Sequence, residues 1–436
     1  MFLPYLLHIP LLLLLIILFK KRRNEDPLLK FYNWGLAIKL LAGIAVGILY
    51  FFFYKNEGDS FVFQKYSSAL TQLLFTNPHE YFNIFFFTNL SEESQQVLQY
   101  YDEPRAFFYI KVLSLLNILS FSNYWINGLY LSLFSFLGSW ILSNSIVKIF
   151  NVSEWVAAFS FLFLPSFVFW TSGVLKESFG IGALFLIIAF SLQYIHQRKT
   201  TFLKILLLIL LLFCCWKLKF YYVLVTVPTL ISYFFIILIE EKFSIIKNPI
   251  LAALSFISIF SLLAVTSVFL IPSLSFQYIW EIIFHSYKVI YQYSLSAGKV
   301  AYELEDMGPE LFKILKNSPE ALWAGLIRPY LWESPMNFAL LAGLENLFIL
   351  GLLAGKVFRL MKAPKKVNAE TIALIVYILL SATLLALIAP NWGTLSRYKT
   401  AFLPFWILLL SIDNPVFAYL EKIGDNLIKA KSKKHV

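Results

Sequence analysis

The chain is dominated by apolar runs of about 20 residues, which is the length that one helix needs to cross a bilayer. The runs are continuous rather than alternating, and this favours helices over the strands of a transmembrane barrel. The sequence therefore predicts an all-α fold, a polytopic membrane helix bundle with about 11 transmembrane helices. The predicted spans are roughly 2–19, 33–54, 124–147, 154–172, 178–195, 202–216, 221–240, 249–271, 336–360, 370–389 and 400–418.

Two further segments are predicted to be helices that lie in the membrane interface. In 62–75, apolar side chains recur at the spacing of one helix face, and polar side chains such as Gln64 take the other face. The segment 105–121 is short for a span and carries Arg105 and Lys111. Counting it as a span would place one set of basic loops outside the membrane, so we expect both segments to lie along the outer surface.

The basic residues predict the orientation, because short cytoplasmic loops are rich in Lys and Arg. An outside N-terminus and a cytoplasmic C-terminus put most basic loops in the cytoplasm and leave two large outer loops, about 55–123 and 272–334. We treat residues 1–436 as a single integral membrane domain. The predicted cytoplasmic basic positions are Lys20 to Arg23, Lys148, Arg198, Lys199, Lys242, Lys247, Lys362, Lys365, Lys366 and Lys429 to Lys434.

Composition narrows the classes of function. Of the 436 residues, 59% are hydrophobic and 14% are charged, whereas a soluble domain averages about 45–50% apolar and about 25% charged residues. A soluble enzyme, a disordered protein and a secreted disulfide scaffold are therefore excluded. The net charge of +11 comes from short loops between spans, so it predicts membrane anchoring rather than nucleic-acid binding.

The sequence predicts no metal site. Cys214 and Cys215 are neighbours inside an apolar run, where an ordinary disulfide cannot form, and the histidines lack ligand spacing. The absence of a Gly-rich phosphate loop argues against a cytoplasmic nucleotide enzyme. No cofactor is predicted, and only a divalent cation stays open.

Acidic residues are scarce, which makes two of them catalytic candidates. Asp59 lies between the second span and the interfacial helix, where a carboxylate held at the outer surface can act as a general base. The same residue also suits a turn or a helix cap. Glu177 begins a predicted span directly after Lys176. It is either a second polar group facing Asp59 across one pocket, or a first-turn residue stabilised by the helix dipole.

The predicted outer segments also hold cations, against the positive-inside tendency. Arg binds phosphate bidentately and Lys binds it as a point charge, and at this depth the phosphate would belong to a lipid. Snorkelling or surface ion pairs also explain these cations. Glu345, inside a predicted span, is either functional or a helix–helix hydrogen-bonding residue. The candidate substrate-binding residues are Lys176, Lys217, Lys219, Arg328, Glu333, Arg397 and Tyr398.

The order of these parts resembles the GT-C superfamily of polytopic glycosyltransferases over most of the chain, as a layout. A span leads to Asp59, interfacial helices follow, and Lys176 and Glu177 come after a Pro-containing helix. Arg397 and Tyr398 precede a Pro-containing span in the last third. In that family the first outer loop holds the catalytic acid, which Asp59 matches. A second acid, commonly Asp, is usual in the second outer loop, where this chain has Glu177.

The resemblance implies a glycosyltransferase of a bacterial cytoplasmic membrane. It would move a sugar from a polyprenyl phosphate or pyrophosphate donor to a glycan, lipid or protein acceptor on the outer face. Asp59 would deprotonate the acceptor hydroxyl, and the outer cations would stabilise the departing phosphate. The cations that the resemblance assigns to the phosphate are Lys217, Lys219, Arg328 and Arg397.

Three alternatives stay open. O-antigen and exopolysaccharide polymerases or ligases have a similar layout and depend on outer-loop arginines, which Arg328 and Arg397 would supply. A transporter or flippase would show paired broken helices and a repeat of the layout, and the sequence has neither. A non-catalytic membrane scaffold would lack a pocket that joins Asp59 to the outer cations.

Overall fold

In a computed structural model of the chain, the described residues are helical and form no strand. One isolated antiparallel bridge joins Ala301 and Asn391. The predicted all-α fold is confirmed for this part of the chain. Of the predicted cytoplasmic cations, Lys199, Lys247, Lys365, Lys366, Lys433 and Lys434 lie outside the described residues. The structure describes residues 3–55, 58–88, 90–98, 100–198, 200–242, 248–270, 275–333, 337–364 and 367–432.

Eight of the described helices are long and apolar enough to cross a membrane, so the chain is a multi-pass membrane protein. A bent pair of helices would be a ninth span if its two parts cross together. The larger predicted number of spans is not confirmed. The eight helices are α1 (Leu3–Arg22), α2 (Tyr32–Phe52), α7 (Tyr124–Phe150), α10 (Lys176–Gln197), α11 (Phe202–Lys242), α12 (Pro249–Leu270), α15 (Asn337–Lys362) and α16 (Ala369–Ile388).

Two predicted spans, 202–216 and 221–240, lie on either side of a kink in α11. The range Phe202–Lys242 is two helices that meet at Lys219. The backbone of Lys219 leaves the helical region there, with φ −150° and ψ 73°. The first helix therefore ends at this residue, and the second begins directly after it.

Two other predicted spans are interrupted. The segment 154–172 forms α8 (Glu154–Ala158), one π turn (Phe159–Phe163) and α9 (Pro165–Trp170). Pro165 starts α9 because a proline lacks the N–H that a helix interior needs but fits the first position of a new helix. The bent pair is α18 (Leu403–Ser411) with α19 (Pro415–Ser432), which meet at an angle of 91° where the segment 400–418 was predicted to cross.

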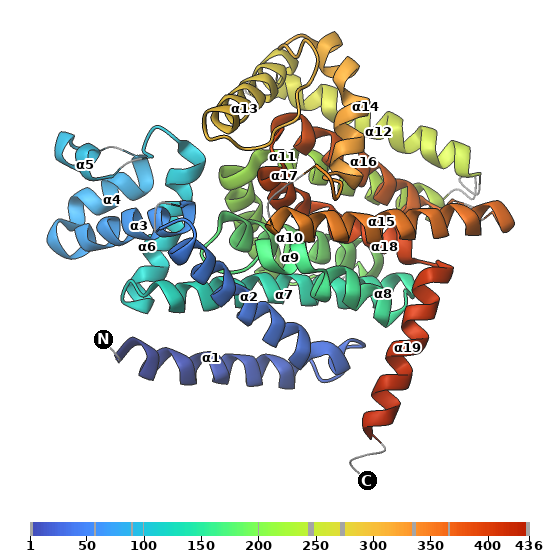
Figure 1. The fold of residues 1–436 in the computed structure, drawn as a ribbon, viewed down its shortest axis with the longest axis horizontal. Helices are drawn as coiled ribbons and strands as arrows, with labels where there is room; N and C mark the ends of the chain where they lie inside the picture. The colour runs from blue at the N-terminus through green and yellow to red at the C-terminus, as the bar shows by residue number, and fades with distance from the viewer. Residues whose placement is uncertain are drawn as a thin grey trace. The chain divides into compact units, whose positions relative to one another are not determined.

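The first of two compact units comprises Met1–Asn151 and Phe161–Val223. Its long helices α2, α7 and α10 pack through small residues: a Cβ on Gly138 of α7 would lie 2.5 Å from the carbonyl oxygen of Gly182 on α10. Four short helices form a second group, as Figure 1 shows. They are α3 (Asp59–Thr76), α4 (Pro78–Phe87), α5 (Glu92–Val97) and α6 (Pro104–Ser120).

Part of the polar face of α3 is buried against other helices, although the sequence suggested a polar face opposite the membrane. Gln64 donates to the Asn117 side chain of α6 at 2.9 Å, and the Asn127 side chain of α7 donates back to Gln64 at 2.9 Å. Thr71 donates to the Ser114 carbonyl of α6 at 3.0 Å. These bonds join α3, α6 and α7, because buried polar groups are stable only when they are hydrogen-bonded. Whether α3 and α6 lie along the membrane surface stays a prediction.

The second compact unit comprises Val152–Ser160 and Leu224–Val436. In this unit α16 packs against α12, α13 (Phe276–Ser296), α14 (Leu311–Ile327) and α18, whereas α15 packs against α18 and α19. The short helix α17 (Trp392–Tyr398) and the 3-10 turn η5 (Lys399–Ala401) lie between α16 and α18 in the sequence.

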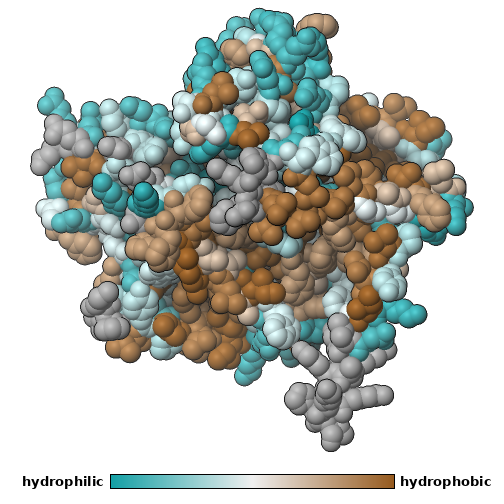
Figure 2. All heavy atoms as spheres, viewed as in Figure 1, coloured by the Kyte–Doolittle hydropathy of each residue, from teal (hydrophilic) through white to brown (hydrophobic). Residues whose placement is uncertain are grey.

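Large apolar side chains are exposed along the spans of each unit. Leu41 on α2 and Leu341 on α15 are each 64% exposed. Figure 2 shows apolar side chains gathered over α2 and over α15. Such surfaces are unfavourable in water and suit contact with the acyl chains of a bilayer.

Candidate functional site

A group of charged and aromatic side chains in contact with one another lies in the second unit. Arg328 directly follows α14, Glu333 comes in the turn after it, Trp392 starts α17, and Lys399 starts η5. Tyr302 reaches the same place from the segment between α13 and α14. We call these five residues the Arg328 cluster.

Glu333 holds Arg328 in a fixed orientation. The Arg328 Nε donates to Oε1 of Glu333 at 2.8 Å, and Nη2 donates to the same oxygen. The other carboxylate oxygen of Glu333 accepts the backbone N–H of Tyr330 at 2.7 Å. The guanidinium therefore lies in place, with its carbon 4.8 Å from the ring centre of Trp392. Cations at this distance over an indole are attracted by the ring quadrupole.

Lys399 is the second cation of the Arg328 cluster and is only 3% exposed. Its Nζ donates to the backbone carbonyl of Arg328 at 2.5 Å. Burial lowers the pKa of Lys399 to about 7, and the carboxylates of Glu345 and Glu333 oppose this shift. Lys399 therefore changes charge near neutral pH. It was not among the predicted site residues, although it directly follows Arg397 and Tyr398 in the sequence.

The aromatic part of the Arg328 cluster includes a hydrogen-bond donor, the indole N–H of Trp392, that has no acceptor among the described residues. Trp392 stacks on Tyr302 with ring centres 4.8 Å apart, and the Tyr302 hydroxyl donates to the Ala386 carbonyl at 2.5 Å. The indole Nε1 of Trp392 is buried and has no hydrogen-bond partner among the described residues. A buried N–H without a partner is costly, so this donor is suited to an oxygen of a bound ligand.

Arg397 and Tyr398 lie at the end of α17, between Trp392 and Lys399, and both are half-buried. The predicted substrate-binding residues of the second unit thus lie on two chain segments, 328–333 and 392–399. Contact between Arg328 and Trp392 brings these segments together. Glu345 of α15 acts on Lys399 electrostatically, and this does not decide between the two roles left open for Glu345.

In the first unit, Asp59 is the first residue of α3, where the positive end of the helix dipole favours a carboxylate. The Lys176 ammonium lies 4.8 Å from the ring centre of Phe63, which is one turn further along α3. The start of α10 therefore lies near the first turns of α3. Whether Asp59 and Glu177 face each other across one pocket stays a prediction.

Glu177 itself is engaged elsewhere. It is fully buried and accepts a hydrogen bond from Lys219 Nζ at 2.7 Å, across the kink of α11. The Tyr222 hydroxyl lies 3.4 Å from the same nitrogen. Each charge thus compensates the other in a place where either alone would be costly. Lys217, the other predicted phosphate contact of this unit, is exposed and lies over the ring of Phe213.

Lys39 is a charged residue that the sequence analysis missed. It lies inside α2, is 3% exposed, and donates to the Thr171 hydroxyl. Its ammonium lies 5.0 Å from the ring centre of Phe167, and it forms no ion pair with any described carboxylate. The signal was an ionisable residue inside an apolar run, which marks a functional candidate by default.

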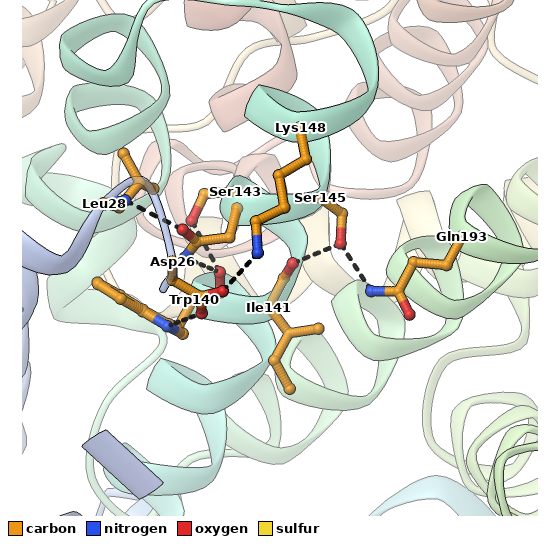
Figure 3. A network of polar contacts seen from close by, with 9 residues as sticks. Asp26, Leu28, Trp140, Ile141, Ser143, Ser145, Lys148 and Gln193 are labelled. Atoms are coloured by element: carbon orange, nitrogen blue, oxygen red, sulfur yellow. Dashed lines mark hydrogen bonds and ion pairs between the residues drawn. The ribbon is translucent and has the colours of Figure 1, made fainter. Parts of the chain in front are cut away.

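A further charged network links the turn before α2 to α7, and Figure 3 shows it. Asp26 accepts hydrogen bonds from Trp140 Nε1 at 3.0 Å and from Lys148 Nζ at 2.8 Å. The Leu28 backbone N–H donates to the Asn144 side chain at 3.1 Å. These bonds satisfy the polar groups of the turn and account for Lys148 without a ligand.

No group of three or more His, Cys, Asp and Glu side chains that could hold a metal ion occurs among the described residues. No protein-family model, curated protein or solved structure matches the chain. The function is therefore inferred from the side chains themselves.

Proposed function

We propose that the protein is a membrane glycosyltransferase that uses a sugar linked to a polyprenyl phosphate or pyrophosphate. The single observation that carries this proposal is the Arg328 cluster, which combines two cations, two stacked aromatic rings and a buried donor. The donor substrate has matching chemistry, because its sugar is bonded to a phosphate that leaves with negative charge. Fixed cations stabilise such a leaving group as its charge develops.

Each residue of the Arg328 cluster has a part in this proposal. Arg328 has N–H groups that do not bond to Glu333, and its Nη1 lies 3.7 Å from the half-exposed carboxylate of Glu320. Guanidinium N–H groups pair well with phosphate oxygens. Lys399 would take up its proton as the phosphate approaches, since an adjacent anion favours the charged amine. Trp392 would donate its indole N–H and offer a ring edge to the sugar. Arg397 and Tyr398, on the same segment, are proposed to line the approach of the donor.

Asp59 is proposed as the general base that accepts the proton of the acceptor hydroxyl. Its support is its position at the first residue of a helix that is packed on α6, because a general base needs fixed geometry. Glu177 is a weaker candidate for this role, since its carboxylate is paired with Lys219. The acceptor side is proposed to be the outer face of a bacterial cytoplasmic membrane, with the N-terminus outside.

A polysaccharide polymerase or ligase is the second candidate, and the same observation favours it. Such an enzyme would use the cations of the Arg328 cluster on the same class of donor without needing Asp59 as a base. The effect of Asp59→Asn on transfer separates the two, because only the leading proposal requires the carboxylate.

The proposal is tested by binding of polyprenyl phosphate to the purified full-length protein. We expect Arg328→Ala to weaken binding by about tenfold or more, since a charged hydrogen bond contributes about 1.5–3 kcal/mol. Arg359→Ala is the matched control, because Arg359 lies near the end of α15 and belongs to no predicted site. Equal binding by the wild type and the Arg328→Ala variant would remove the Arg328 cluster from the donor site.

A further inference from the structure

In the first unit, α6 packs against the first part of α11 through aromatic and basic side chains. Phe108 of α6 meets Phe213 of α11 edge to face, with ring centres 5.9 Å apart. The guanidinium carbon of Arg105 lies 4.9 Å from the ring centre of Phe220. The two helices therefore touch along a line on which basic residues of both helices lie.

Arg105 of α6 and Lys217 of α11 lie at this contact, and Lys111 of α6 is close enough to Lys217 for the two charges to interact. We call these three cations the basic seam. Lys111 is 7% exposed, and its Nζ donates to the Thr88 hydroxyl at 2.8 Å. Burial lowers the pKa of Lys111 to about 8, and the positive charge of Lys217 lowers it further. Among the described residues, no carboxylate forms an ion pair with any of the three cations.

An exposed apolar stripe leads along α11 to the basic seam. Leu206, Ile209, Leu210 and Phe213 follow the spacing of one helix face and are 53%, 59%, 54% and 51% exposed. Lys217 is the next residue on this face, one turn beyond Phe213. Because α11 is one of the candidate spans, this stripe suits an acyl chain, and the seam lies where the head of that lipid would be.

We propose that the basic seam binds the phosphate of an anionic phospholipid whose acyl chain lies along the apolar stripe of α11. Basic pockets between membrane helices hold anionic head groups in this way. A phosphate would compensate the ammonium groups of Lys111 and Lys217, which repel each other and form no ion pair with a carboxylate of the described residues. The site lies wholly in the first unit and does not depend on the proposed glycosyl transfer.

The test is native mass spectrometry of the full-length protein, released from nanodiscs of phosphatidylglycerol and phosphatidylcholine in equal amounts. The wild type should retain phosphatidylglycerol in preference to phosphatidylcholine. Lys111→Met and Lys217→Gln should each lower that retention roughly tenfold, the loss expected for one charged contact. The control is Lys65→Met, which removes an exposed lysine from α3 of the same unit and should change nothing.

Three results would overturn this assignment. Equal retention of the two lipids by the wild type would exclude an anionic head-group site. An equal loss in the Lys65→Met variant would show that retention follows total charge rather than the basic seam. Displacement of the lipid by millimolar inorganic phosphate would identify free phosphate as the ligand and remove the acyl chain from the site. Thermal unfolding of Lys217→Gln, whose side chain is exposed, verifies that the variant is folded.

Discussion

Lys399 is the residue at which pH should act on substrate binding. Burial lowers the pKa of Lys399 to about 7, so the amine is mostly charged at pH 6 and mostly neutral above pH 8. We expect affinity for polyprenyl phosphate to fall roughly tenfold between pH 6 and pH 8.5, as the amine loses its proton. The phosphate also titrates near pH 6. The measurement is therefore the difference between the wild type and Lys399→Met, and identical pH profiles would contradict it.

The lowered pKa of Lys399 should affect stability in the opposite direction: substrate binding weakens as the pH rises, whereas the folded state becomes more stable. The unfolded chain holds the proton of Lys399 up to its ordinary pKa of 10.5, whereas the folded chain releases it near 7. The unfolded state thus binds more protons between these values, and the free energy of unfolding should rise with pH across this window. Denaturation of the wild type at pH 7 and pH 9, compared with Lys399→Met, measures this contribution. A smaller gain in the wild type than in the variant would exclude it.

Substitutions of Arg328 can show whether the phosphate is bound by a bidentate contact or by charge alone. Arg328→Lys keeps the charge but loses the planar fork that Glu333 orients, so it should restore only part of the binding that Arg328→Ala loses. Titration with polyprenyl phosphate at fixed pH measures both variants. Full rescue by lysine would mean that only the charge matters at this position.

For single residues, the sequence indicated which side chains are candidates for the site, but not which side chains they contact. Arg328 and Arg397 stood out because outer cations run against the positive-inside tendency, and Glu177 stood out because acids are scarce. The partner of Glu177 could not be predicted, because Lys219 is 42 positions away and reaches it only through the kink of α11. Lys39 was missed because one lysine hardly changes the hydropathy of a long apolar run.

At the scale of elements, the Glu177–Lys219 pair ties the start of α10 to the kink of α11. Glu177→Gln should destabilise the fold by about 3–5 kcal/mol, because it leaves the Lys219 charge buried without a counter-ion. Glu177→Leu combined with Lys219→Met should be close to neutral, since it removes both charges. Unfolding of the variants in detergent measures the difference. If Glu177→Gln lost transfer at unchanged stability, Glu177 would be catalytic.

The length of the apolar runs predicted the helix boundaries, except where a proline or a kink interrupted a run. Runs with a uniform apolar pattern, such as α7 and α16, lie where they were predicted. The segment 154–172 broke at Pro165. The two runs around Lys219 follow each other without a loop, because only the backbone of Lys219 leaves the helical region. The polar face of α3 repeats with helical spacing, but spacing cannot distinguish water from a neighbouring amide as its partner.

For the whole molecule, the proposed topology is tested with single cysteines at exposed positions. Ser296→Cys, at the end of α13, should react with a membrane-impermeant thiol reagent that is added from outside. Asn426→Cys, on α19, should not react with it. The basic loops predict this pattern. Labelling of Asn426→Cys alone would invert the topology and move the proposed acceptor side to the cytoplasm. The native Cys214 and Cys215 are buried, so they give a low background.

The most direct test of glycosyl transfer needs no knowledge of the sugar. Every proposed donor leaves the same kind of product, so mass spectrometry can follow the release of polyprenyl phosphate or pyrophosphate in vesicles that hold the protein and the lipid-linked sugars of its host. We predict release that depends on acceptor, falls about 10²–10⁴-fold in Asp59→Asn, as for other removed general bases, and falls in Arg328→Ala. Equal release by the wild type and both variants would contradict the proposed function.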